Sequence, residues 1–240
     1  LYSVMDRKIT FAIGEYYHLY NRGVEQRVIF KDKRDHARFV ALLRCCNTKE
    51  TINLNQHFAA GGTYETLFQF PDTDRLVAMG AYCLMPNHFH ILVREIVPGG
   101  ISKFMLKLGT AYSMYFNRKN SRKGTLFSGP FQARHVIGDN YLKYLYAYIH
   151  LNPVKIIEPK WKEEGIVRRK DVEKYLEQFD FSSYRDYAGE RRIAGVVLSP
   201  SEFPDYFTGK DAFKSHLNDW LSYAEEAQAI IKPQKRTPLF

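Results

Sequence analysis

Two apolar runs in the middle of the chain, residues 75–85 and 88–95, are separated only by Pro86-Asn87. Runs of this kind on either side of a short turn signal are typical of two adjacent antiparallel strands. The second run, HFHILVRE, carries His88 and His90 one residue apart. Because side chains alternate across a strand, we expect both imidazoles on one face and the apolar side chains on the other, toward a core.

The remaining elements follow in an order that predicts the fold. Periodicity and turn signals predict strands over residues 15–23, 75–85, 88–95 and 131–137, and helices over residues 33–47, 102–118 and 140–152. Asp32 is expected to cap the first helix, and Asp139 or Asn140 the third. Residues 48–73 are polar and are predicted to form a loop or small insertion. The order predicts an α+β, ferredoxin-like fold, an antiparallel sheet with helices on one face.

The chain divides into two parts that differ in charge. Residues 1–159 contain 21 lysines and arginines against 12 aspartates and glutamates, whereas residues 160–240 contain 14 of each. We therefore expect a domain over residues 5–157 and a C-terminal, mostly helical appendage over residues 158–240. The spacing of five apolar residues predicts an amphipathic helix in the appendage: Phe213, Leu217, Trp220, Leu221 and Ala224.

The excess of positive charge includes a stretch, residues 96–138, that has no acidic residue at all. Basic and aromatic side chains are interleaved there, which favours a polyanion such as nucleic acid over an ordinary solvated helix face. The alternative is a basic surface that serves only solubility. The residues predicted to contact nucleic acid are Arg22, Lys103, Lys107, Arg118, Lys119, Arg122, Lys123 and Arg134.

The sequence also indicates the cellular compartment in which the protein is expected. The sequence has no apolar run of about 18 residues, so no membrane span is expected, and no signal peptide is visible. Three cysteines without C-x-x-C spacing suit a reducing compartment. We therefore expect a cytoplasmic protein that does not bind membranes.

A pair of imidazoles on one strand face can share a divalent metal ion, although most strand histidines are only hydrogen-bonded polar residues. The segment NYLKYLYAYIHLNP offers a neutral oxygen donor, because Asn152 lies four residues after Tyr148 and shares its helical face. Two histidines and one asparagine leave the charge of Mg²⁺ or Mn²⁺ uncompensated. An ion held in this way polarises a phosphodiester oxygen strongly.

The same segment offers four tyrosines, and a tyrosine hydroxyl is a candidate nucleophile. Tyr146 lies about 200° round the helix from Tyr148 and should face elsewhere. Tyr141 and Tyr144 lie near the face of Tyr148, so position alone leaves three candidates. For Tyr141 and Tyr144 we favour the alternative that they belong to an aromatic core.

The stretches MPNHFHILV, YHLYNRG, GTLFSGPFQARHV and YLKYLYAYIHLNPVK together resemble the HUH single-tyrosine transposases, in particular the REP-associated tyrosine transposases. The resemblance covers about residues 15–157, and FSSYRDY (181–187) is similar to a downstream segment of that branch. Residues 48–73 depart from it, because the family turns more quickly from helix to strand. The resemblance implies that His88, His90 and Asn152 bind the metal ion and that Tyr148 is the nucleophile.

The resemblance implies metal-dependent cleavage and rejoining of single-stranded hairpin DNA, with Mg²⁺ or Mn²⁺ as the cofactor. Attack by Tyr148 would give a 5′-phosphotyrosine and a free 3′-hydroxyl, and strand transfer would then reseal the DNA without ATP. Relatives outside this branch are dimers that exchange their tyrosines. The long appendage here favours a monomer over a homodimer.

One alternative function remains open, and two others are disfavoured by the residues that follow the histidine pair. A hairpin-DNA binding protein with little or no cleavage activity would share every feature above. A histidine-triad nucleotide hydrolase would need a third alternating histidine where Leu92 stands. A metallo-hydrolase of the His-x-His-x-Asp-His type would need an aspartate and a histidine where Leu92 and Val93 stand.

Overall fold

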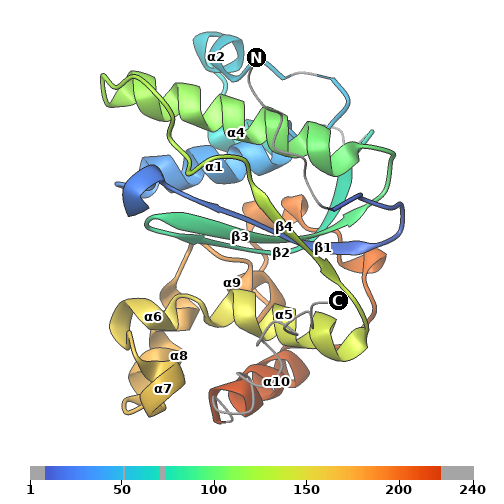
Figure 1. The fold of residues 1–240 in the computed structure, drawn as a ribbon, viewed down its shortest axis with the longest axis vertical. Helices are drawn as coiled ribbons and strands as arrows, with labels where there is room; N and C mark the ends of the chain where they lie inside the picture. The colour runs from blue at the N-terminus through green and yellow to red at the C-terminus, as the bar shows by residue number, and fades with distance from the viewer. Residues whose placement is uncertain (1–8, 51, 71–73, 223–240) are drawn as a thin grey trace, which may run out of the picture.

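The protein folds around a four-stranded antiparallel sheet with the strand order β2-β3-β1-β4. The computed structural model describes residues 9–50, 52–70 and 74–222. The strands are β1 (Tyr16–Arg22), β2 (Val77–Met85), β3 (His88–Glu95) and β4 (Gln132–Val136). This order and the helices that connect β1 to β2 and β3 to β4 confirm the predicted ferredoxin-like α+β arrangement (Figure 1).

Two helices cover one face of the sheet, α1 (Lys33–Cys45) and α4 (Gly100–Lys119) (Figure 1). Asp32 caps α1 as predicted, since its side chain accepts a hydrogen bond from the backbone N–H of Asp35. The inward residues of the central strands pack beneath these helices, and Ile91 and Val93 are completely buried there. This packing fixes the face on which the two histidines of β3 must lie, because neighbouring residues of a strand point to opposite sides.

The other face of the sheet is covered by α5 (Asp139–Leu151), which is followed directly by α6 (Val154–Ile157) (Figure 1). The helix α5 ends before Pro153, as predicted. Its predicted cap is wrong: Gly138 holds the N-cap position with φ at 82°, and no side chain makes a capping hydrogen bond. Glycine adopts such a positive φ without strain, so the entry to α5 depends on backbone geometry rather than on Asp139 or Asn140.

Most of the C-terminal helices pack onto α5 and α6 from the side away from the sheet (Figure 1), whereas residues 193–197 contact α1 and residues 200–202 contact β2. They contain α7 (Trp161–Glu164), α8 (Arg169–Gln178), α9 (Tyr184–Tyr187), α10 (Lys210–Ser222) and the 3₁₀ helices η2 (Ile193–Val197) and η3 (Pro200–Glu202). The predicted amphipathic helix corresponds to α10, and Ala224 lies outside the described residues. A domain boundary at residue 157 stays a prediction.

The predicted insertion contains two short helices, α2 (Leu54–Ala59) and α3 (Tyr64–Leu67). Leu54 and Leu67 are buried in the hydrophobic cluster that α1 and the sheet share, so this segment belongs to the same core as the sheet. A further 3₁₀ turn, η1 (Val24–Gln26), follows β1. None of the helices in the described part of the chain is long and apolar enough to cross a membrane.

Candidate active site beneath the sheet

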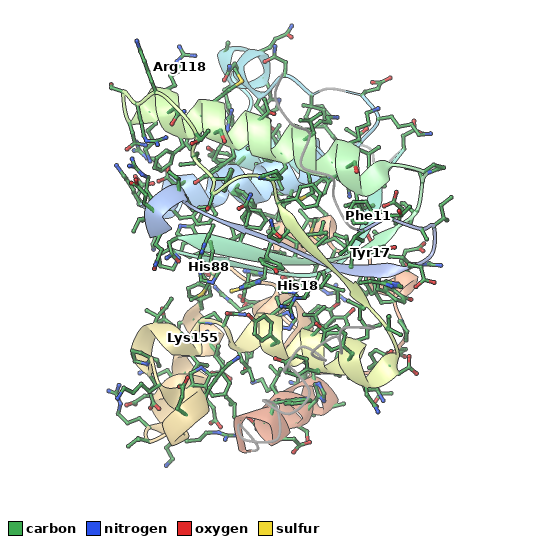
Figure 2. All side chains as sticks on the ribbon, in the orientation of Figure 1. Phe11, Tyr17, His18, His88, Arg118 and Lys155 are labelled. Atoms are coloured by element: carbon green, nitrogen blue, oxygen red, sulfur yellow. The ribbon has the colours of Figure 1, made fainter. Side chains whose placement is uncertain are left out.

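His88 and His90 both lie on the sheet face that α5 and α6 cover. The register of the sheet pairs His90 with Tyr20 of β1 and with Cys83 of β2, which places it in the middle of the sheet. His88 lies at the beginning of β3, opposite Arg22, and is half-buried. Figure 2 shows His88 beneath the sheet and above α6. The sequence prediction that the two imidazoles share one face is confirmed.

A third histidine, His18 of β1, lies beside these two, and the three residues His18, His88 and His90 form a histidine cluster. Nε2 of His18 lies 2.9 Å from Nδ1 of His90, and the two rings are stacked with centroids 5.0 Å apart. No role in the site was predicted for His18, which is part of the stretch YHLYNRG. The alternation of the strand predicts that His18 shares one face with Tyr16 and Tyr20. The sequence does not show which face this is, because only the pairing of β1 with β3 turns it toward His90.

The Nδ1 atoms of both β3 histidines are engaged, which leaves their Nε2 atoms for other partners. Nδ1 of His88 lies 2.6 Å from Oδ1 of Asn87, so the ring donates its Nδ1 proton to that carbonyl oxygen. When Nδ1 of His90 donates to Nε2 of His18, Nε2 of His90 likewise carries the lone pair. Metal-binding histidines in proteins are held in this way, through a hydrogen bond from the second ring nitrogen.

The environment keeps all three imidazoles neutral. Burial is the largest cause for each, and it lowers the pKa of His18 to about 3 and the pKa of His88 to about 4. The pKa of His90 falls well below its usual value because of burial and the neighbouring histidines and lysines. Only a neutral imidazole has the lone pair that a metal ion needs, so these shifts favour ligation across the physiological pH range.

Tyr148 of α5 lies against this cluster. Its ring centroid is 5.3 Å from that of His90 and 5.8 Å from that of His18, both in edge-to-face geometry. Asn152 is buried one turn later, and its Nδ2 donates to the backbone carbonyl oxygen of Tyr148 over 2.7 Å. Burial raises the pKa of the Tyr148 hydroxyl, whereas a hydrogen bond from Asn152 and the charge of Arg134 lower it.

The other tyrosines of α5 have different surroundings. Tyr146 is buried on the far side of the helix, where it packs against Tyr187 and Phe203. The ring of Tyr144 packs against Trp220, and its buried hydroxyl has no hydrogen-bond partner among the described residues. Tyr141 stacks on Tyr144. Of the four, Tyr148 is therefore the one whose ring contacts the histidine cluster.

A cavity of about 210 Å³ opens beside Tyr148. Its walls come from β1, β3, β4 and α5, and its lining residues are His18, Tyr20, His90, Arg134, Tyr141, Tyr144, Leu145 and Tyr148. The charged groups that act on the histidines are all cationic: Arg22, Arg134, Lys155 and Lys162. The cavity therefore combines aromatic walls with positive charge, which suits a nucleotide and its phosphate.

The structure separates the predicted nucleic-acid contacts into two groups. Arg22 and Arg134 lie next to the histidine cluster, on the strands β1 and β4. The other six lie on α4 or in the loop after it, on the opposite face of the sheet: Lys103, Lys107, Arg118, Lys119, Arg122 and Lys123. Figure 2 shows Arg118 near the end of α4, away from the histidines.

Several of these six make contacts within the protein. Lys107 donates to the carbonyl oxygens of Thr48 and Glu50. Lys119 forms ion pairs with Asp32 and Asp35, and the Asp35 carboxylate is completely buried. Arg122 donates to the side chain of Asn117 and to the carbonyl oxygen of Thr125. These side chains hold α1, α4 and the following loop together, whatever else they contact.

His88, His90 and Asn152 offer nitrogen and neutral oxygen donors to a divalent ion. In the described part of the chain, no group of three or more His, Cys, Asp or Glu side chains is arranged to hold a metal ion. A site made of two histidines and one amide oxygen is of a different kind, because its third ligand is an asparagine. The Nε2 atoms of His88 and His90, whose ring centroids are 5.0 Å apart, and the amide of Asn152 are therefore the groups to consider for a metal ion.

Comparisons with known proteins show which proteins this chain resembles. A search of curated proteins found no match. One solved structure is similar, that of a REP-associated tyrosine transposase bound to a REP hairpin, with 13% sequence identity, a TM-score of 0.43, and coverage of 78% of this chain and 88% of that one. A TM-score below 0.5 does not by itself establish a shared fold.

Residues 42–152 match the family model described as "Transposase IS200 like". The match includes His88, His90, Tyr148 and Asn152, whereas His18 lies before it and Lys155 and Lys162 lie after it. This match confirms the predicted resemblance to the single-tyrosine transposases, because residues 42–152 are similar to the IS200-like transposases.

Proposed function

We propose that the protein is a metal-dependent single-stranded DNA transesterase of the REP-associated tyrosine transposase type. It would bind hairpin DNA, cleave it through a 5′-phosphotyrosine intermediate and rejoin the strands. One observation carries the proposal: the ring of Tyr148 lies 5.3 Å from the ring of His90, beside a cationic cavity, and all of these residues come from one chain. A nucleophile, candidate metal ligands and a phosphate-sized space thus lie together.

His88 and His90 would hold the metal ion through their Nε2 atoms, with the amide oxygen of Asn152 as the third protein ligand. The hydrogen bonds to Asn87 and His18 support this role, because they fix the tautomer and the orientation of each ring. A divalent ion such as Mg²⁺ or Mn²⁺ bound there supplies polarisation of a scissile phosphate oxygen.

The protein's own groups then act on the nucleophile and on the phosphate. Tyr148 Oη forms a bond to phosphorus, the bond between phosphorus and the 3′ oxygen breaks, and its electron pair leaves with that oxygen. The proton lost from Tyr148 is balanced by the proton that the 3′ oxygen gains. Arg134 favours negative charge on Tyr148, because it lowers the pKa that burial raises.

A single chain is the proposed active unit. Tyr148, His88 and His90 lie together within one chain, so catalysis does not require a tyrosine from a second subunit. The alternative function is hairpin-DNA binding with little or no cleavage activity, and it differs only in the outcome of the chemical step.

Trapping of the covalent intermediate tests the proposed function. The substrate is a pool of single-stranded oligonucleotides in which a palindromic hairpin is flanked by randomised single strands, labelled at either the 5′ or the 3′ end. With Mn²⁺ present, we expect the 3′ label to become attached to the protein and the 5′ label to be released. Hairpin binding without any attached label would support the alternative function instead.

His18 is expected to support the metal ion through His90. Replacing it with leucine places an apolar side chain in this buried position and removes the hydrogen bond to Nδ1 of His90. Loss of such an orienting partner typically weakens metal affinity about 10- to 100-fold. Calorimetric titration of the DNA-free protein with Mn²⁺ measures this. The exposed His135→Ala is the control, and equal affinity in His18→Leu and His135→Ala would contradict the role.

The basic residues on α4 and its loop are expected to contact DNA phosphates outside the cleavage site. For Arg118→Ala, Arg122→Ala and Lys123→Ala, each lost contact should lower the slope of log affinity against log salt by roughly 0.7. Lys174→Ala, an exposed residue of the charge-balanced appendage, serves as the control. An unchanged slope in all three would mean that this positive charge serves only solubility.

A further inference from the structure

Lys162 lies outside the segment that matches the family, yet its side chain reaches Tyr148. It belongs to the short helix α7, which is anchored by the buried ring of Trp161 in the core shared with α6 and α8. The Nζ atom of Lys162 lies 4.5 Å from the centroid of the Tyr148 ring and 5.5 Å from that of Trp161. Both distances are within the range of a cation–π contact.

Lys162 carries its charge in a partly buried position. Burial, together with the charge of Lys155, lowers the pKa of Lys162 to about 8, and Glu163 partly opposes this shift. Lys155 and Lys162 also both act on His90. Placing two ammonium groups near a buried, neutral histidine costs free energy, so such an arrangement is typical of a site that receives an anion.

A cation over the face of a tyrosine ring distinguishes the two protonation states of that tyrosine. The neutral phenol offers only the quadrupole of its ring, whereas a phenolate spreads its negative charge over the ring carbons. The ammonium group therefore attracts the phenolate more strongly than the phenol. An interaction that strengthens as Tyr148 Oη loses its proton accelerates the attack rather than only binding the ground state.

We propose that Lys162, supplied by the C-terminal appendage, is a positioning residue for Tyr148 that holds its ring and stabilises negative charge on it during attack on DNA. The inference rests on the proposed function, since it assigns Lys162 to the same transesterification. In that step the bond from Tyr148 Oη to phosphorus forms, the bond to the 3′ oxygen breaks, and the proton lost from Oη is balanced by the one that the 3′ oxygen gains. Lys162 keeps its own proton throughout.

The proposal also gives the appendage a role in the site. The family match ends at residue 152, before α6 and α7 begin. The appendage packs through Trp161 and through the third hydrophobic core onto Ala147 and Leu151 of α5. Lys162 is therefore held over Tyr148 by the same packing that fixes the appendage to the domain.

Four variants of the full chain test the proposal against the labelled hairpin pool with Mn²⁺. Lys162→Met keeps the length of the side chain and removes its charge, Lys162→Gln is a second neutral variant, and Lys162→Arg keeps the charge. Lys170→Met changes an exposed lysine of α8 and is the control. The measurements are the single-turnover rate of adduct formation at saturating DNA, the hairpin affinity and the melting temperature.

Both neutral variants are expected to form the adduct roughly tenfold more slowly, with hairpin affinity and melting temperature close to those of the wild type. Lys162→Arg should restore most of the rate, because a guanidinium group also binds an aromatic face. Adduct formation by both neutral variants at the wild-type rate would overturn the proposal. Equal slowing in Lys162→Arg would also overturn it, because it would indicate a packing role.

The two proposals fail in distinguishable ways. If the wild-type protein forms no adduct, the proposed function and the role of Lys162 are both refuted. If the wild type forms the adduct and the neutral variants match it, only the role of Lys162 is refuted.

Discussion

Replacing Tyr148 with phenylalanine is expected to abolish the covalent protein–DNA adduct, a loss on the order of 10³-fold or more in the rate of cleavage. Phenylalanine removes only the attacking oxygen and keeps the ring contacts with His90 and His18. Hairpin affinity, Mn²⁺ affinity and melting temperature should therefore stay close to the wild-type values. Gel analysis of 3′-labelled DNA attached to the protein measures the loss.

Tyr144→Phe is the matched control for this variant. It makes the same chemical change one turn earlier on α5, at a hydroxyl that has no hydrogen-bond partner among the described residues. We expect Tyr144→Phe to form the adduct at nearly the wild-type rate. If Tyr144→Phe lost the adduct while Tyr148→Phe kept it, the assignment of the nucleophile would be wrong.

Replacing His88 with alanine is expected to remove metal-dependent cleavage, on the order of 10³-fold, while hairpin binding is largely retained. His88 is the more informative of the two strand histidines, because it is half-buried at the beginning of β3, and its replacement should disturb the packing less than that of His90. His90→Ala should have the same chemical effect. It should also lower the free energy of unfolding, because His90 is only 6% exposed in the middle of the sheet.

The control for the histidine variants is His135→Ala, an exposed residue whose register partner on β1 is Tyr17 rather than a residue of the histidine cluster. Cleavage rates are compared across a series of Mn²⁺ concentrations at fixed DNA. Undiminished cleavage by His88→Ala at low Mn²⁺ concentration would contradict the metal assignment.

The sheet and its two main helices could be predicted because local signals and burial agree there. The turn at Pro86-Asn87 and the alternation in β3 define the hairpin, and Asp32 begins α1 through a hydrogen bond between residues close in sequence. The entry to α5 differs, because Gly138 caps the helix through its positive φ. Backbone geometry of that kind leaves no side-chain signal, whereas Asp139 and Asn140 both have typical capping side chains.

The candidate site was only partly predictable from the sequence. Spacing within a single strand or helix predicts which residues of β3 and of α5 share a face. The sequence alone therefore predicted that Tyr148 and Asn152 lie on the same face of a helix. His18 and Lys162 enter through contacts between segments far apart in the chain, across the sheet for one and across the appendage for the other. Their places depend on strand register and on the packing of Trp161, so no pattern within a single element assigns either residue to the site.

Sequencing of the peptide that carries the trapped DNA tests the central claim most directly. Cleavage after Lys143 and Lys155 gives one peptide with Tyr144, Tyr146 and Tyr148, while Tyr141 falls in the preceding peptide. After nuclease treatment, fragmentation of the modified peptide locates the remaining nucleotide on one residue. We predict a phosphotyrosine at Tyr148. A nucleotide on any of the other three tyrosines would contradict the proposed mechanism.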